Sequence, residues 1–168
     1  PAVTGWALGA DELAREALVT VVSNNAVLLG QARRFDEAVE LLRQAEASFG
    51  ADPDLAARRQ ELLHNQVVSL VEAGDLDGAD RVLDAPATAG LFAPSDRREL
   101  QVWVVQVRAD RSARVRDWTA AASTVAAGLA RLGNDGELLR AFEAYTHNAF
   151  ARLYNDRRFA EAATLRVL

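Results

Sequence analysis

The sequence lacks cysteine, lysine, isoleucine and methionine, and only four of its 168 residues are proline. The absence of cysteine excludes disulfides, thiol chemistry and zinc sites built on cysteine ligands. All 19 basic residues are arginine, which indicates a GC-rich coding sequence and describes a genome rather than a function.

Basic clusters and long apolar runs are also missing. The net charge is −5 and no basic cluster exceeds an arginine pair, which argues against a direct nucleic-acid partner. No apolar run approaches the roughly 18 to 20 residues of a membrane span, and no signal peptide with a basic start opens the chain. We therefore expect a cytoplasmic protein that contacts neither nucleic acid nor membrane.

Motifs for catalysis are absent as well. The chain has no glycine-rich phosphate loop, no nucleophile elbow and no HExxH sequence. Its two histidines, His64 and His147, are 83 residues apart with no adjacent carboxylate pair, which is a poor basis for a metal site. The prediction is a protein that is not an enzyme and that holds no metal or cofactor.

What the chain does contain is an internal repeat. Half of the residues are hydrophobic, which is enough for a folded core. In four short segments an aromatic residue or leucine precedes an alanine by three positions, and these alanines, called the marker alanines below, recur at intervals of 41, 42 and 41 residues. The marker alanines are Ala38, Ala79, Ala121 and Ala162.

Apolar residues at helical spacing lie before and after each marker alanine, so each repeat is predicted to be a pair of helices. The first helices are expected near 11–31, 54–73, 96–113 and 137–155, and the second helices near 35–49, 76–85, 117–132 and 159–168. The corresponding repeats cover approximately 11–50, 54–94, 96–133 and 137–168 of a single domain that spans residues 1–168. The last repeat stops within its second helix, where Val167 and Leu168 are still apolar, so we expect a longer parent chain, or a partner or second copy that covers this end.

The segment from Ala26 to Gly30, leading to Arg34 and on to Ala38, resembles the tetratricopeptide repeat. The resemblance covers residues 19–168, and the period is similar to the roughly 42-residue variant of kinesin light chains and of bacterial signalling regulators. It implies an all-α fold, a right-handed superhelical solenoid of antiparallel helix pairs, in which first helices line a concave groove. The third repeat departs from the pattern, with Ser112 in place of leucine.

Asparagine occurs fourteen residues before the marker alanine in three repeats, at Asn24, Asn65 and Asn148. In families with this repeat, such asparagines often hydrogen-bond to the backbone of an extended peptide, for which a primary amide offers both donors and an acceptor. The alternative is that they bond to a neighbouring helix end or to water. The positions just before them hold His64, Gln106 and His147.

Helical spacing adds further groove positions, among them Trp103 and Arg114. The remaining positions are Val27, Gln31, Val68, Glu72, Asp110, Ala151 and Asn155. The resemblance thus implies a protein-interaction module that binds a peptide or an extended partner segment. The alternative is a structural or regulatory domain of a larger protein that mediates self-association or autoinhibition. The candidate binding residues are Asn24, His64, Asn65, Trp103, Gln106, Arg114, His147 and Asn148.

Overall fold

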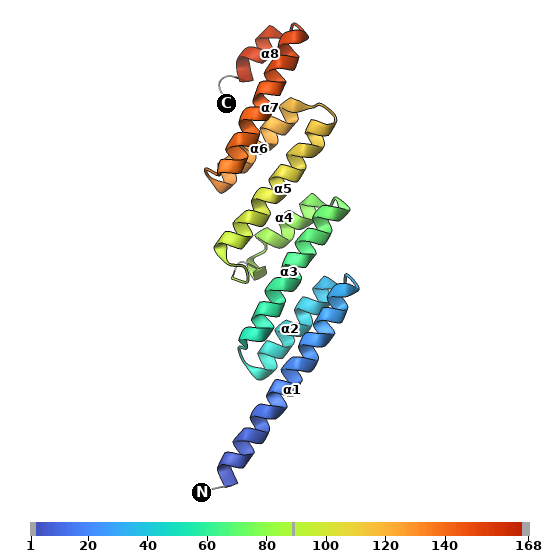
Figure 1. Cartoon of the computed structure of the whole chain (residues 1–168), viewed down its shortest axis with the longest axis vertical. Helices are drawn as coiled ribbons and strands as arrows, with labels where there is room; N and C mark the ends of the chain where they lie inside the picture. Colours follow the sequence, from blue (N-terminus) through green and yellow to red (C-terminus); the bar gives the residue numbers. More distant parts are fainter. Residues whose placement is uncertain (1–2, 89, 166–168) are drawn as a thin grey trace. The chain divides into compact units, whose positions relative to one another are not determined.

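The computed structural model describes residues 3–88 and 90–165, and their side chains at 12–86, 88 and 90–165. Within these ranges the chain is entirely helical and contains no strand (Figure 1). The helices are α1 (Val3–Gln31), α2 (Phe35–Phe49), α3 (Pro53–Ala73), α4 (Leu76–Asp84), the 3₁₀ turn η1 (Pro86–Thr88), α5 (Pro94–Arg114), α6 (Trp118–Leu132), α7 (Gly136–Asn155) and α8 (Phe159–Thr164).

The eight expected helices are present, and most of their ends lie within one or two residues of the predicted ones. The start of α1 is an exception, because this helix begins at Val3 rather than near residue 11. Residues 3–10 precede the part of the sequence that repeats, so the repeat pattern could not locate this start. At the other end, α8 ends at Thr164, and the predicted helical residues Val167 and Leu168 lie outside the described ranges.

The chain forms two compact parts, an N-terminal half (Pro1–Phe92) with α1 to α4 and a C-terminal half (Ala93–Leu168) with α5 to α8. In the N-terminal half, α2 packs between α1 and α3, and α4 packs against α3. In the C-terminal half, α6 packs between α5 and α7, and α8 packs against α7. The predicted single domain and the predicted superhelix both depend on how the two halves are placed relative to one another, so both stay predictions.

The two halves share one register with an offset of 83 residues, which is two repeats. Helix α2 (Phe35–Phe49) and helix α6 (Trp118–Leu132) begin and end 83 residues apart, and so do the starts of α3 and α7. Both α3 and α7 are capped by an aspartate, Asp52 or Asp135, whose carboxylate accepts two backbone N–H groups of the first turn. Residues 83 apart are called equivalent below.

The same turn joins the two helices of every repeat. Five residues before each marker alanine the backbone is left-handed, with φ of 59° at Arg33, 88° at Gly74, 60° at Arg116 and 60° at Arg157. The next amide donates to the carbonyl five residues earlier, as from Arg34 to Leu29 at 2.9 Å, which is the bond of a Schellman motif. Glycine is favoured at such a position because it has no Cβ atom to clash. The three arginines adopt the same left-handed conformation at a modest cost in free energy.

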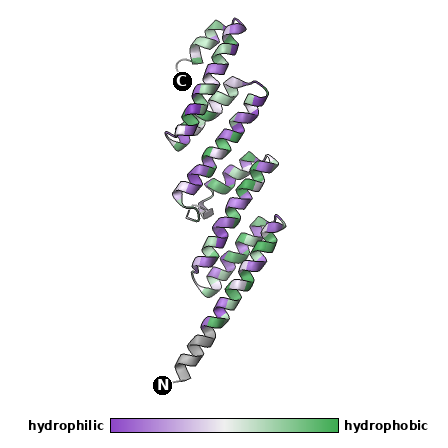
Figure 2. Cartoon of the chain, viewed as in Figure 1, coloured by the Kyte–Doolittle hydropathy of each residue, from purple (hydrophilic) through white to green (hydrophobic). Residues whose placement is uncertain are grey.

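The core lies between the helices of each half. All four marker alanines are buried, at 0, 0, 0 and 2% exposed, as predicted for close helix contacts. Figure 2 shows the corresponding alternation of hydrophobic and hydrophilic residues around the helices. Ala38 packs in one cluster with Leu42 and Leu55 of the N-terminal half, and Ala121 packs with Val125 and Leu138 of the C-terminal half.

The end of the C-terminal half has a small cluster of its own. Leu165 is 7% exposed and packs with Leu153 and Ala162, so it belongs to this core rather than to an uncovered face. Trp118, three residues before the marker alanine Ala121, packs against the same cluster from a half-buried position. Leu168, which the sequence interpretation places on the uncovered face, lies outside the described residues.

Candidate functional site

In the N-terminal half the first helices α1 and α3 border a hollow of about 370 Å³. Asn65 lines it, together with four residues that helical spacing assigns to the groove. These four are Val27, Gln31, Val68 and Glu72. They come from both helices, because residues three and four apart share one face of a helix. The described geometry therefore places five candidate groove residues around one space.

The floor of this hollow is apolar. Leu62 of α3 is 3% exposed and lies close to Gly30 of α1. A Cβ atom on Gly30 would come within 2.5 Å of the Leu62 Cδ2 atom, so the glycine allows Leu62 to lie against α1. Phe35 lines the hollow at its end nearest the turn between α1 and α2.

A second hollow of about 390 Å³ lies further along the same two helices and is lined by Asn24. Arg58 and Glu61 line both hollows, and their side chains form an ion pair at 2.5 Å. The two hollows are therefore parts of one face between α1 and α3, with Asn24 and Asn65 at separate points along it.

The side-chain amides of Asn24 and Asn65 have no hydrogen-bond partner in the described chain, and both residues are exposed. Other polar side chains of this half are paired across helices. Gln66 donates to Asp36 at 2.9 Å, and Arg59 forms an ion pair with Glu46 at 2.6 Å. In this geometry neither asparagine bonds to a neighbouring helix end, and the other part of the alternative, a bond to water, stays a prediction.

In the C-terminal half, α5 and α7 border a hollow of about 440 Å³ that Trp103 and Gln106 line. It is equivalent to the Asn24 hollow, since Val102 and Val19 line corresponding walls and Glu137 corresponds to Asp54. Here, however, the candidate amide has a partner, because Gln106 donates to Glu137 at 3.0 Å.

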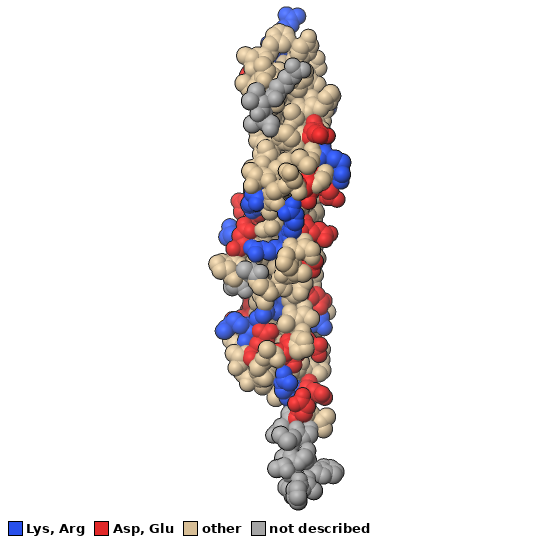
Figure 3. Space-filling model, turned by 90° about the vertical axis from the view of Figure 1, so that its left-hand side faces the viewer, with Lys and Arg blue, Asp and Glu red and all other residues tan. Residues whose placement is uncertain are grey.

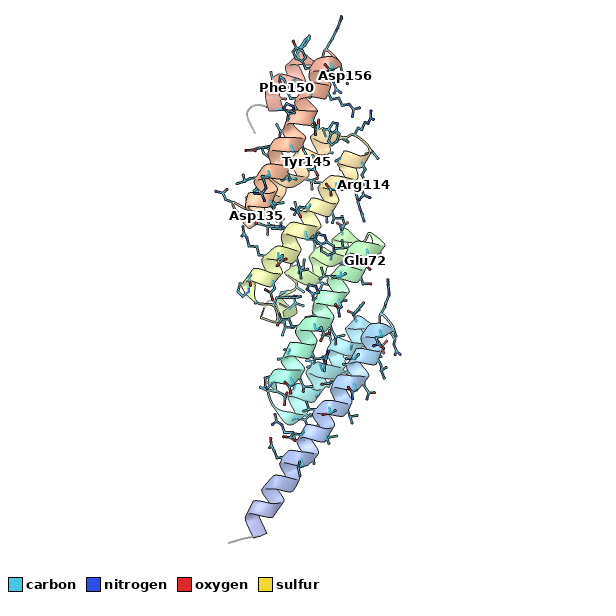
Figure 4. All side chains as sticks on the ribbon, in the orientation of Figure 1. Glu72, Arg114, Asp135, Tyr145, Phe150 and Asp156 are labelled. Carbon is cyan, nitrogen blue, oxygen red and sulfur yellow. The ribbon has the colours of Figure 1, made fainter. Side chains whose placement is uncertain are left out.

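Tyr145 of α7 (Figure 4) reaches across to α5, where its hydroxyl donates a hydrogen bond to Asp110. Its ring stacks on Trp118 with a centroid distance of 6.3 Å. Burial of the ring and then the bond to Asp110 raise the pKa of Tyr145 to about 12. This side chain was not among the sequence candidates, because Tyr145 corresponds to a core leucine in the first half.

The other candidates lie apart from these hollows. His64 and His147 are exposed on α3 and α7, and neither is among the residues that line the hollows beside them. Arg114 is exposed at the C-terminal end of α5 (Figure 4), and Asn148 is half-buried on α7. Neither residue lines the hollow that contains Trp103 and Gln106.

The charged side chains of the two halves do not form a patch of one sign on the side that Figure 3 shows. Figure 3 shows acidic and basic side chains interspersed along the face in view. Several form short pairs one helical turn apart, such as Arg34 with Glu37 at 2.5 Å and Arg158 with Glu161 at 2.6 Å. The pairing lowers the pKa of Glu37 and of Glu161 through hydrogen bonds from the partner arginine.

Among the described side chains, no group of three or more histidine, aspartate or glutamate residues is placed to hold a metal ion. None of the described helices is long and apolar enough to cross a membrane. Comparison of the chain with protein-family models, curated proteins and solved structures found no match.

Proposed function

We propose that the chain is a tetratricopeptide-type binding module whose first helices receive an extended segment of a partner protein. One observation carries the proposal: Asn24 and Asn65 occupy the same place in two consecutive repeats, border hollows on one face, and have no hydrogen-bond partner in the described chain. The proposal assigns the chain no catalytic step.

The chemistry of this face suits a peptide backbone. An extended peptide presents N–H and C=O groups at regular intervals, and a primary amide can pair with either kind. Val27 and Val68 line the same hollow as Asn65, so a peptide bound there would form such a bond beside apolar side chains. Each bond formed would contribute about 0.5 to 1.5 kcal/mol net.

A second candidate function is self-association through the outer side of α1. Leu18, Val21 and Leu28 are 46, 56 and 61% exposed there. With Ala14 and Asn25, which are also exposed, they follow the alternating spacing of four and three residues that forms the seam of a coiled coil. Light scattering on the wild type and on Val21→Asp tests this candidate. The wild type is expected to be a dimer, and the charge introduced by Val21→Asp is expected to dissociate it.

The binding proposal can be tested without a known partner. Peptides that bind the whole chain are first selected from a displayed random library. Their affinities for the wild type and for Asn24→Ala/Asn65→Ala are then measured by calorimetry. We expect the double variant to lose roughly 1 to 3 kcal/mol of binding free energy with little change in thermal stability. Asn134→Ala is the control, since Asn134 is exposed between α6 and α7 and lines neither hollow.

Two results would contradict the proposal. Equal affinity of the folded double variant and the wild type would show that the asparagines do not bind the peptide. A large drop in melting temperature would instead show that they hold the helices together.

A further inference from the structure

The hollow beside Asn65 has an equivalent region in the C-terminal half, where most of the lining residues differ. Leu62 of the N-terminal half corresponds to Tyr145 of the C-terminal half, 83 residues later. The leucine is part of the hollow's lining, whereas the tyrosine extends from α7 to α5 and bonds to Asp110.

The contacts of Tyr145 show which part of the N-terminal half corresponds to the position of its ring. Trp118, on which the ring stacks, corresponds to Phe35. Asp110, to which the hydroxyl donates, corresponds to Val27. Both Phe35 and Val27 line the hollow of the N-terminal half. The tyrosine ring therefore occupies, in the C-terminal half, the space between the two walls that the N-terminal half leaves open.

We propose that the hollow between Phe35, Val27 and Leu62 is a socket for the aromatic ring of a partner residue, the position that Tyr145 fills from within in the C-terminal half. This inference rests on the proposed function, because the ring would belong to the extended segment that Asn65 holds. It gives the module one aromatic anchor site, in the N-terminal half.

The walls of the socket favour phenylalanine over tyrosine. In the C-terminal half the wall that meets the hydroxyl is the carboxylate of Asp110, but the equivalent wall is Val27, which has no acceptor in its side chain. A hydroxyl turned toward Val27 would lose its water without gaining a partner, which costs free energy. A phenyl ring carries no such cost and gains contact with Phe35 and Val68.

The test uses the whole chain and peptides selected from the displayed library, each resynthesised with its aromatic residue replaced. We expect one phenylalanine to recur among the selected peptides, and its replacement by alanine to weaken binding by about ten- to a hundredfold. Replacement by tyrosine should weaken binding less than replacement by alanine.

On the protein side, Leu62→Tyr should fill the socket and abolish the preference for phenylalanine. Gln31→Trp, at an exposed position on the same hollow, serves the same purpose if Leu62→Tyr fails to fold. Conversely, Tyr145→Leu with Asp110→Val gives the C-terminal half the side chains of Leu62 and Val27 at the equivalent positions, and this variant should bind a second phenylalanine peptide.

The possible outcomes separate this inference from the proposed function. Peptides that depend on Asn24 and Asn65 but carry no aromatic residue would overturn the socket and leave the binding proposal standing. Selected phenylalanine peptides that bind Leu62→Tyr and Gln31→Trp as well as the wild type would also overturn it. A library from which nothing binds would overturn both.

Discussion

The N-terminal and C-terminal halves use one backbone plan but place their polar contacts between different helices. In the N-terminal half, Arg59 of α3 forms an ion pair with Glu46 of α2, and both side chains are mostly buried. The equivalent residues of the C-terminal half are Phe142 and Leu129, which pack against the apolar cluster there.

The reverse exchange occurs between the first helices. The C-terminal half joins α5 and α7 through the hydrogen bond from Tyr145 to Asp110, where the N-terminal half has Leu62 and Val27. The register of the helices and the left-handed turns between them are kept through both exchanges. The helix framework therefore tolerates either kind of contact at either place, whereas the shape of the face between the first helices depends on which kind is present.

The largest expected effect comes from breaking the ion pair of the N-terminal half. Arg59→Phe alone leaves the Glu46 carboxylate without its partner and should cost roughly 1 to 3 kcal/mol of unfolding free energy, below the range for fully buried pairs because both side chains retain some exposure. Adding Glu46→Leu reproduces the C-terminal half and should recover most of that loss.

A double-mutant cycle measured by urea unfolding checks this expectation. If the double variant is as unstable as Arg59→Phe, the two halves are not interchangeable at this contact. Arg43→Phe is a control, because Arg43 pairs with Glu40 at an exposed site, where ion pairs contribute little.

A smaller effect is expected from the contact that is particular to the C-terminal half. The pKa of Tyr145 is raised to about 12 in the folded chain, whereas an unfolded tyrosine titrates near 10. The stability that this shift contributes is therefore fully present below about pH 10 and is lost as the pH rises toward 12. Tyr145→Phe should remove this alkaline loss, at a cost near neutral pH of about 0.5 to 1.5 kcal/mol for the missing hydrogen bond.

Chemical unfolding at a series of alkaline pH values measures the difference between wild type and Tyr145→Phe. Tyr154→Phe is the matched control, since Tyr154 is exposed and stacks on Phe150 without a hydrogen-bond partner in the described chain. A parallel alkaline loss in wild type and Tyr145→Phe would rule out Tyr145 as its source.

The smallest effects concern the left-handed turns, where the halves differ at one equivalent pair, Gly74 and Arg157. Gly74→Ala should cost about 1 kcal/mol, because φ of 88° is unfavourable for a residue with a Cβ atom. Arg157→Gly should raise the free energy of unfolding by no more than about 1 kcal/mol. Removing the strain of a left-handed arginine is offset by the greater conformational freedom of glycine in the unfolded chain. Thermal unfolding distinguishes the two, and a stabilised Gly74→Ala would show that the turn is not held left-handed.

Much of the fold follows from the sequence because the determining interactions are local. The recurrence of the marker alanines and the apolar spacing around them predicts each helix pair, since only a small residue lets two helices approach closely. Even Ser112, which departs from the repeat pattern, keeps the turn, because its carbonyl accepts the Asp117 amide at 2.9 Å as leucine carbonyls do in the other repeats.

The candidate site could be predicted only in part. Helical spacing brings Val27, Gln31, Asn65, Val68 and Glu72 to one hollow, because position on a helix fixes the direction of a side chain. Spacing does not reveal whether a side chain already has a partner. Asn65 and Gln106 look alike as candidates, yet only Gln106 donates to a carboxylate of the adjoining helix.

The sequence by itself determined the helix pairs, their turns and the buried alanines, since these depend on residues within one repeat. Only the tertiary structure decided which hollows stay open. Whether Leu62 leaves space or Tyr145 fills it depends on how far a side chain of α3 or α7 reaches toward the preceding first helix and on what it meets there. That outcome is set by contacts between residues about 35 positions apart, such as Asp110 and Tyr145, which no local pattern specifies.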